Sequence, residues 1–249
     1  MKDKIEIFKY DNIDDNFISI IELHKSLISF TKLNNRLIYF DENFPVYFRK
    51  VIQESKSDYI MISLVNENFA GFIHLKSYED TVFLNNICLI DSYKGKGIGK
   101  KLLYKSLSIL EPSNFRFLAL DVFKSNELAL SWYNKIGLKE VKETKWKQIL
   151  LKNSKQIIKD LNKISYKFDT NGFYSLYFEN AKIGTIIKKE TLLLHDFSHI
   201  EKIKNINLTV ITNQYIPLSS GVYYETIDLE SSIRMKGLLK NIVASLINQ

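Results

Sequence analysis

The sequence predicts an α/β fold with a mixed central sheet flanked by helices, followed by a C-terminal α+β extension or small domain. Over residues 1–150, strand-like runs and helical periodicity follow one another in the order β-α-α-β-β-β-α-β-α-β. Within residues 82–123 a strand, a helix and a strand succeed one another, which is typical of a parallel pair. Residues 151–249 show mainly short strand-like runs, so we expect a domain boundary near residue 150.

The first half begins with a strand, two helices and a run of three strands. Asp14 is a suitable N-cap for the first helix, and Pro45 confines the start of the second. The polar break Asn66-Glu67-Asn68 separates two apolar runs and indicates a β-hairpin. The expected bounds are 5–8, 14–29, 42–54, 59–65, 70–75 and 82–90.

A glycine-rich turn follows, and then a helix with one apolar face that reaches about Leu110, before Pro112 blocks its continuation. Residues 117–123 read as a buried strand. The next helix is expected over 126–136, closed by Gly137 in the C′ position. The last strands of this half are expected within 138–150.

The C-terminal region carries no motif of known chemistry. We expect a terminal helix over 229–247. The other expected elements are a helix at 155–163, a hairpin at 173–178 and 181–188, and strands at 208–212 and 222–227.

Composition limits the class of protein. The chain has 249 residues, 45% of them hydrophobic, and a net charge of +7 that no Lys/Arg run concentrates, so we expect no nucleic-acid partner. No apolar stretch reaches the ~20 residues of a membrane span, and the first twenty residues lack the apolar region of a signal peptide. We therefore expect a cytoplasmic protein that binds no membrane.

The turn Lys94-Gly95-Lys96-Gly97-Ile98-Gly99-Lys100 indicates an anion site. Alternating glycines let successive backbone N–H groups point at one anion, and the following helix adds its positive end. A Walker loop from Gly95 would require glycine where Lys100 stands. A dinucleotide fingerprint requires G-x-G-x-x-G, whereas the spacing here is G-x-G-x-G.

The same turn resembles the acyl-CoA loop of the GNAT superfamily of N-acyltransferases, [Arg/Gln]-x-x-Gly-x-[Gly/Ala], except that Lys94 replaces the Arg or Gln. A second segment resembles another signature of that family. There Asn126 would begin a helix, Ala129 would be its small residue, and Tyr133 precedes Gly137-Leu138. The resemblance covers roughly residues 5–150.

The resemblance implies a fold, a cofactor and roles. It implies acyl-CoA as co-substrate, an acetyl or longer acyl group, and direct attack by a primary amine in a ternary complex. Asn126 would contact the pantetheine or adenosine side, and Tyr133 would protonate the departing thiolate. The alternative for Tyr133 is a core aromatic. Backbone groups of Ile87, Cys88 and Leu89 would hold the pantetheine arm, and Lys94, Gly95, Lys96, Gly97, Ile98, Gly99 and Lys100 would hold the pyrophosphate.

The general base is the open question of this resemblance. Many relatives place a carboxylate on the fourth strand, where this chain has Asn85 and Asn86. His74, on the preceding strand, is the candidate we name, because imidazole titrates near neutrality; a structural histidine or a water chain are the alternatives. Other candidates are Glu79, Asp80, Glu22 and His24.

The single cysteine and a pair of histidines are not expected to be functional. Cys88 stands in a hydrophobic strand, which favours a buried thiol over a nucleophile. His195 and His199 lie four residues apart, but no further ligand completes a set, so we expect no metal.

Two functions remain open. The first is an N-acyltransferase whose acceptor is an amine of a small molecule, peptide or protein, with residues 30–47 walling the acceptor site. In that case residues 151–249 bind the acceptor or form a homodimer. The second is a catalytically weak or inactive CoA-binding module, which the missing carboxylate favours.

Overall fold

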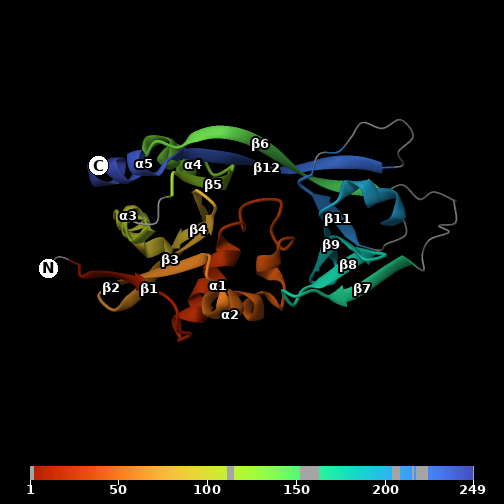
Figure 1. Ribbon diagram of the computed structural model, residues 1–249, viewed down its shortest axis with the longest axis horizontal. Coiled ribbons are helices and arrows are strands. Elements are labelled where there is room, and N and C mark those ends of the chain that lie inside the picture. Colours follow the sequence, from red (N-terminus) through yellow and green to blue (C-terminus); the bar gives the residue numbers. More distant parts are fainter. Residues whose placement is uncertain are drawn as a thin grey trace. The chain divides into compact units, whose positions relative to one another are not determined.

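The computed structural model describes residues 3–110, 115–151, 163–203, 208–214, 216 and 224–248. The chain divides into two compact units whose segments alternate along the sequence (Figure 1). Unit 1 comprises Met1–Ile28, Phe48–Glu143 and Ser232–Gln249, and unit 2 comprises Ser29–Tyr47 and Thr144–Ser231. The linear boundary near residue 150 stays a prediction, and the two units are described separately below.

Unit 1 is a mixed sheet with helices on both faces. Its strand order is β1-β2-β3-β4-β5-β12, and the only parallel neighbours among these described strands are β4 and β5, as predicted for residues 82–123. Its elements are β1 (Ile5–Lys9), α1 (Asn16–Ser26), α2 (Phe44–Glu54), β2 (Asp58–Val65), β3 (Asn68–Tyr78), β4 (Thr81–Leu89), α3 (Ile98–Leu110), β5 (Phe117–Phe123), α4 (Glu127–Lys135), the start of β6 (Lys139–Leu151), the end of β12 (Tyr224–Leu238) and α5 (Leu239–Asn248).

The pleat of β3 separates the two faces of this sheet. Ile73 and Leu75 point into the main core, which they share with the apolar stripes of α3, α4 and α5. Phe72 and His74 point to the opposite face. There the Phe72 ring centroid lies 4.5 Å from that of His24 on α1, and the His74 ring centroid lies 5.7 Å from that of Phe48 on α2. Alternation along one strand therefore divides an apolar face from a face that carries polar groups.

The C-terminal end of unit 1 corrects one prediction. Instead of a helix over 229–247, the chain forms β12 up to Leu238, and only Leu239–Asn248 is helical. Ile233 and Met235 are buried while Arg234 between them is exposed, which is the period of a strand and not of a helix. The strand forms because it pairs along the whole of β5, from Ser232 opposite Phe123 to Leu238 opposite Phe117.

Unit 2 is built on a second run of strands in the order β6-β11-β10-β9-β8-β7, in which β10 and β11 are parallel. The strands β7 and β10 were not predicted, and the helix expected over 155–163 lies, except for residue 163, outside the described residues. The elements are β7 (Ile164–Phe168), β8 (Tyr174–Phe178), β9 (Ala181–Ile187), β10 (Thr191–Leu194), the 3-10 helix η5 (Phe197–Ile203) and β11 (Thr209–Thr212).

Residues 29–47, which are most of the connection between α1 and α2 and the first turn of α2, belong to unit 2. The buried Asp41 carboxylate accepts a hydrogen bond from the backbone N–H of Lys188, after β9, at 2.9 Å. Arg36 donates to the Gln148 side chain on β6 at 2.8 Å. These contacts attach a segment that lies between two helices of unit 1 to the strands of unit 2.

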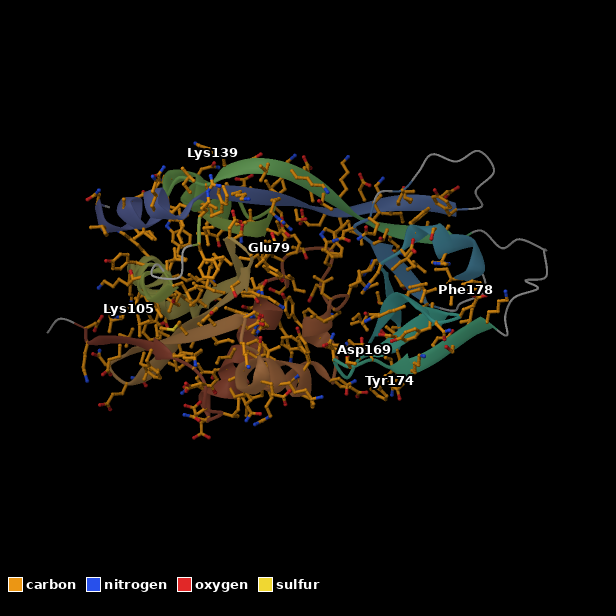
Figure 2. All side chains as sticks on the ribbon, in the orientation of Figure 1. Glu79, Lys105, Lys139, Asp169, Tyr174 and Phe178 are labelled. Carbon is orange, nitrogen blue, oxygen red and sulfur yellow. The ribbon has the colours of Figure 1, made fainter. Side chains whose placement is uncertain are left out.

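A second buried carboxylate in unit 2 fixes the turn between β7 and β8. Asp169, labelled in Figure 2, accepts hydrogen bonds from the backbone N–H of Phe173 and the Ser175 hydroxyl, and pairs with Lys182 at 2.5 Å. Burial is the largest single influence and opposes its ionisation, but these donors outweigh it and hold the pKa of Asp169 below its ordinary value. This carboxylate thus ties the turn to β8 and β9.

Candidate functional site

The glycine turn presents backbone N–H groups to solvent at the start of α3. Gly95 and Gly97 both adopt φ of +74°, a conformation that turns the chain and that glycine reaches without a Cβ penalty. Among the backbone hydrogen bonds of the described residues, the first donor after Lys94 is Lys101, which bonds to the Gly97 carbonyl. The amides from Gly95 to Lys100 therefore lack a backbone acceptor, and the positive end of α3 adds to their attraction for an anion.

Lysine charges around this turn are only partly available to an anion. The Lys94 ammonium pairs with the exposed Asp91 carboxylate at 2.6 Å, and the pKa of Asp91 is lowered chiefly by that hydrogen bond. The Lys96 ammonium lies over the Tyr93 ring at 5.7 Å from its centroid. Backbone amides, more than lysine side chains, make this turn a fitting cradle for a pyrophosphate.

The strands β4 and β5 pair over only part of their length. Their parallel register runs from Thr81 opposite Phe117 to Leu84 opposite Leu120 and stops there. Beyond this point, the β4 segment from Asn85 to Leu89 has no β5 partner in the described register. Its backbone groups on that side can therefore serve a ligand, as the resemblance implies for Ile87, Cys88 and Leu89.

Tyr133 projects from α4 toward this part of β4. Its side chain is buried, with 7% of its surface exposed, and belongs to the main core of unit 1. Burial, and secondarily the nearby Cys88, raises the pKa of Tyr133, so the phenol keeps its proton at neutral pH.

The Tyr133 hydroxyl has no hydrogen-bond partner among the described residues. Among the residues that the structure describes, the one fully buried side-chain polar atom without a partner is Trp146 Nε1, so the Tyr133 hydroxyl keeps some exposure to solvent. A protonated, partly exposed and unengaged phenol can act as a proton donor. The core and donor interpretations of Tyr133 therefore do not exclude each other, because the ring packs while the hydroxyl is free.

Asn126 has a structural task at the start of α4. Its side-chain oxygen accepts from the backbone N–H of Ala129 at 3.2 Å, which caps the helix that Tyr133 belongs to. Gly137, at φ +103°, ends the same helix. A direct contact between Asn126 and a cofactor stays a prediction.

Cys88 lies on β4 with its sulfur 3.5 Å from the Ser26 hydroxyl of α1. Burial is the main cause that raises the pKa of its thiol. A thiol that stays protonated is a poor nucleophile, so the geometry favours the predicted buried group.

The candidate bases separate clearly in space. Glu79, labelled in Figure 2, and Asp80 lie in the exposed turn at the end where β4 and β5 are paired, away from the unpaired segment. Glu22 is exposed and pairs with Lys25 at 2.7 Å. His24 is buried and donates from Nδ1 to the Ile20 carbonyl at 2.8 Å.

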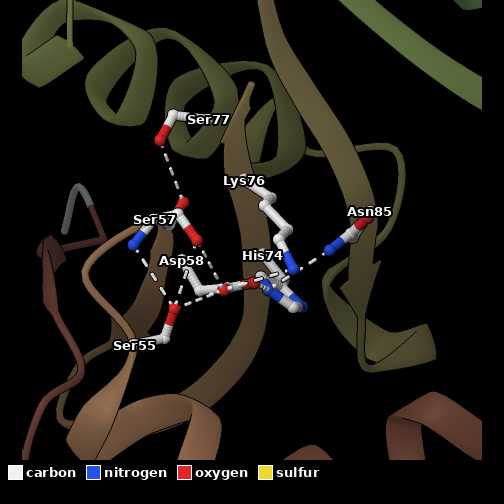
Figure 3. Close-up of polar contacts among 7 residues, drawn as sticks. All are labelled: Ser55, Ser57, Asp58, His74, Lys76, Ser77 and Asn85. Carbon is white, nitrogen blue, oxygen red and sulfur yellow. Dashed lines mark hydrogen bonds and ion pairs between the residues drawn. The ribbon is translucent and has the colours of Figure 1, made fainter. Parts of the chain in front are cut away.

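His74 differs from these candidates because a carboxylate holds it. Its Nε2 lies 2.6 Å from Oδ1 of Asp58 on β2, and the Asn85 amide nitrogen is 3.3 Å from the same atom (Figure 3). Asp58 was not predicted as a site residue, because the sequence pattern does not show the register in which β2 pairs with β3. The signal available was the hairpin, in which Asp58 and His74 are near neighbours across the strands.

Other polar groups give no sign of a metal site. His195 lies 3.3 Å from the Thr185 hydroxyl, whereas His199 lies 3.4 Å from Asp196, so the two histidines have separate partners. Across the described ranges, no three His, Cys, Asp or Glu side chains group as metal ligands would. Within the same ranges, none of the helices has the length and apolar character to cross a membrane.

Comparison with known proteins agrees with this geometry. Residues 25–138 match the model of the Acetyltransferase (GNAT) family. A ribosomal protein bS18-alanine N-acetyltransferase from Haemophilus influenzae is 36% identical over 84 residues, which make up 33% of this chain and 57% of that protein. The chain thus spans little more than half the length of that relative.

A solved structure supports the fold over a longer range. A putative acetyltransferase from Pyrococcus horikoshii is similar over 92% of this chain and 88% of its own, with 11% identity and a TM-score of 0.59. At that identity the likeness shows the fold alone. The family match, the glycine turn and the mixed sheet agree, and residues 25–138 of this chain are similar to the GNAT acetyltransferase family.

Proposed function

We propose that this chain is an N-acyltransferase that moves an acetyl or longer acyl group from acyl-CoA to a primary amine. The observation that carries the proposal is the row of amides from Gly95 to Lys100, which have no backbone acceptor and stand at the start of α3. They fit a pyrophosphate, and the unpaired segment of β4 leads away from them along the sheet. The family match over residues 25–138 supports the same donor.

The reaction needs one bond made, one broken and two proton transfers. The neutral amine nitrogen attacks the thioester carbonyl carbon, and the C–S bond breaks with its electron pair on sulfur. The Tyr133 phenol gives its proton to that sulfur, which its raised pKa permits because the hydroxyl is protonated at neutral pH. The proton lost by the amine goes to a base, for which His74 is our candidate.

The nature of the acceptor is proposed from a relative. The similar protein from Haemophilus influenzae acts, by its name, on an alanine of a ribosomal protein. A peptide that begins with alanine is therefore the first acceptor to test, beside small primary amines. Residues 30–47 are the segment we propose to contact the acceptor, and residues 151–249 are proposed to bind the acceptor or to form a homodimer.

The second candidate function is a CoA-binding module without turnover. Asn85 and Asn86 favour it, since neither amide can accept a proton at the place where many relatives carry a carboxylate. The two candidates share the donor site and differ only in chemistry, so they are separated by measuring binding and turnover on the same sample.

The test measures thiol release from acetyl-CoA over an amine panel that includes an alanine-initiated peptide. We expect Tyr133→Phe to lower kcat by about 10²–10⁴-fold, the usual contribution of general acid–base catalysis, while acetyl-CoA still raises the melting temperature. Leu128→Ala, which changes an exposed residue of the same helix, is the matched control and should leave kcat unchanged. Binding without turnover on any amine would leave the module, and no shift in melting temperature would reject both functions.

A further inference from the structure

A buried carboxylate–imidazole pair joins β2 to β3 in unit 1. The side chains of Asp58 and His74 are 5% and 8% exposed, and Oδ1 of Asp58 lies 2.6 Å from Nε2 of His74 (Figure 3). An ionised carboxylate only accepts hydrogen bonds, so this contact assigns the ring proton to Nε2. The other ring nitrogen, Nδ1, is then the one with a free electron pair.

Asp58 is itself firmly held. Its Oδ2 accepts from the Ser55 hydroxyl at 2.5 Å and the Ser57 hydroxyl at 3.3 Å, and the Lys76 ammonium stands 3.7 Å away (Figure 3). Burial is the largest influence on this group and opposes its ionisation. Hydrogen bonds from His74 and Ser55 outweigh burial, so the pKa of Asp58 lies below its ordinary value. The carboxylate is therefore ionised at neutral pH.

Nδ1 of His74 is open. Among the described residues, the polar contacts of this ring are at Nε2, which donates to Asp58, while the Asn85 amide nitrogen lies 3.3 Å from the same Nε2. Since the one fully buried polar atom without a partner in the described ranges is Trp146 Nε1, Nδ1 retains exposure to solvent. Nδ1 is therefore the ring nitrogen that can accept a proton.

The position of the ring in the sheet matters. The pairing of β3 with β4 shifts register after His74, which lies opposite Asn86 while Leu75 lies opposite Leu84, so Asn85 is the extra residue of a bulge. That bulge comes immediately after Leu84, the last residue of β4 that pairs with β5. His74 therefore stands next to the point where β4 leaves β5 and its ligand-facing segment begins.

We propose that Asp58 and His74 form the proton-accepting pair of the acyl transfer, with Nδ1 of His74 as general base and Asp58 as positioning residue. The inference rests on the proposed function. As the nitrogen of the neutral amine forms the C–N bond, its proton passes to Nδ1, directly or through a hydrogen-bonded water. The C–S bond breaks with its electron pair on sulfur, which takes the Tyr133 proton; the imidazolium then returns its proton to solvent and the Tyr133 phenolate takes one back. This pair replaces the carboxylate that Asn85 and Asn86 cannot supply.

The charges around the pair are compatible with this cycle. From α1, His24 faces His74, but it stays neutral because burial lowers its pKa to about 3. From α2 the neighbour is the uncharged Phe48 ring, and β4 contributes the neutral amides of Asn85 and Asn86. Lys76, on β3 itself, lies nearest to Asp58. Asp58 is thus the negative charge that faces the ring and stabilises its protonated form.

The first experiment reads the tautomer without any substrate. In ¹⁵N-labelled protein the His74 ring, assigned with His74→Gln, should show the proton on Nε2 at neutral pH. Asp58→Asn should move the ring toward the Nδ1–H form. Asp169→Asn removes an equally buried, fully bonded carboxylate from unit 2 and should leave the His74 signals unchanged. A wild-type ring protonated on Nδ1 would overturn the proposal.

The second experiment reads the pH dependence of turnover with an amine found active in the panel. We expect His74→Gln to lower kcat by about 10²–10⁴-fold and to remove the acidic limb of kcat/KM. Asp58→Asn should keep that limb but move it to lower pH by about one to two units, because the protonated ring loses its facing negative charge. The melting-temperature response to acetyl-CoA should persist in both variants, which shows that unit 1 is folded.

The outcomes separate the two levels of the argument. Turnover in His74→Gln with an unchanged acidic limb refutes the pair while the acyltransferase stands. Binding of acetyl-CoA with no turnover on any amine by the wild-type protein refutes the acyltransferase and, with it, the catalytic role of the pair. An Asp58→Asn variant that melts earlier but keeps the wild-type limb reduces Asp58 to a structural residue.

Discussion

Two histidines of unit 1 are buried near each other and differ in what their environment does to them. His24 donates a hydrogen bond from Nδ1 to the Ile20 carbonyl of its own helix, and its ring lies between those of Phe48 and Phe72. His74 is paired with a carboxylate and keeps a nitrogen open. The environment of His24 disfavours protonation of its ring. The environment of His74 favours protonation, because a carboxylate faces that ring.

His24 should make folding stability depend on pH below its ordinary pKa. Its pKa is 6.5 in the unfolded chain and about 3 in the folded protein, chiefly because of burial. Below about pH 6.5 the unfolded chain therefore binds a proton that the folded protein does not, and stability falls as pH drops toward 3. Urea unfolding between pH 4 and 7 should show this slope, and His24→Gln should reduce it; the part that remains belongs to His195, whose pKa burial also lowers.

Two sets of groups serve as controls for the dependence of the free energy of unfolding on pH. His199→Gln alters a ring that packs on Phe178 in unit 2 and should leave the slope in place. The pKa values of Asp58 and Asp169 are lowered, so both ionised carboxylates stabilise the fold. That stabilisation is lost only as pH falls below their ordinary pKa near 3.8, which is a more acid window. An unchanged slope in His24→Gln would show that another group is responsible.

At the element scale, the start of α3 is where backbone conformation and ligand recognition coincide. Gly97→Ala places a Cβ on a residue at φ +74°, which costs about 1–2 kcal/mol, and distorts the row of free amides. We expect acetyl-CoA affinity, measured by calorimetry, to fall at least tenfold. Gly172→Ala imposes similar strain at φ +83° in a turn of unit 2 and should cost stability without affecting acetyl-CoA affinity.

The connection between α1 and α2 is the second element with a testable attachment. Asp41→Ala removes the acceptor that holds the Lys188 N–H, and about 1–3 kcal/mol of stability should be lost with it. Hydrogen exchange should accelerate over residues 29–47. The neighbouring Glu42→Gln breaks only an exposed pair with Lys189 at 3.7 Å and should change neither.

Elements that are specified by local sequence could be predicted, and elements that are specified by a distant strand could not. The strand at 117–123 and the helix ending at Leu110 were predicted at their observed limits, because an uninterrupted buried run and a one-sided apolar stripe specify them locally. Residues 229–238 were predicted to be helical, although their apolar spacing fits a strand as well. Pairing with β5 decides between them, and that partner is more than a hundred residues away.

The candidate site divides in the same way. The glycine turn and Tyr133 could be found from the sequence because contiguous motifs carry them. Asp58 could not, because its role arises from the register of β2 on β3. The bulge at Asn85 was likewise invisible, since a register shift is a property of two strands together. Whether these residues act in catalysis stays a prediction.

At the scale of the whole molecule, residues 232–249 complete unit 1. Ile242 of α5 is fully buried in the main core, whereas Ile247 of the same helix is 61% exposed. Ile242→Ala should therefore destabilise unit 1 by about 2–5 kcal/mol, and Ile247→Ala by less than about 0.5 kcal/mol.

The two tryptophans allow the effect to be located. Trp132 belongs to unit 1 and Trp146 to unit 2, so Trp146→Phe leaves a fluorescence probe in unit 1 alone. In that background Ile242→Ala should lower the denaturant midpoint reported by Trp132. If that midpoint stayed at the parent value, residues 232–249 would belong with the C-terminal region, as a linear division at residue 150 requires.

The return of the chain to β5 also sets an order of events during translation. The ribosome releases β1 to β5 early, but the strand that covers the free edge of β5 and the helix that closes the core emerge only after all of unit 2 has been made. Until then the nascent chain carries an uncovered strand edge, which is a template for unwanted pairing. We therefore expect unit 2 to have its full sequence outside the ribosome before unit 1 can reach its native state.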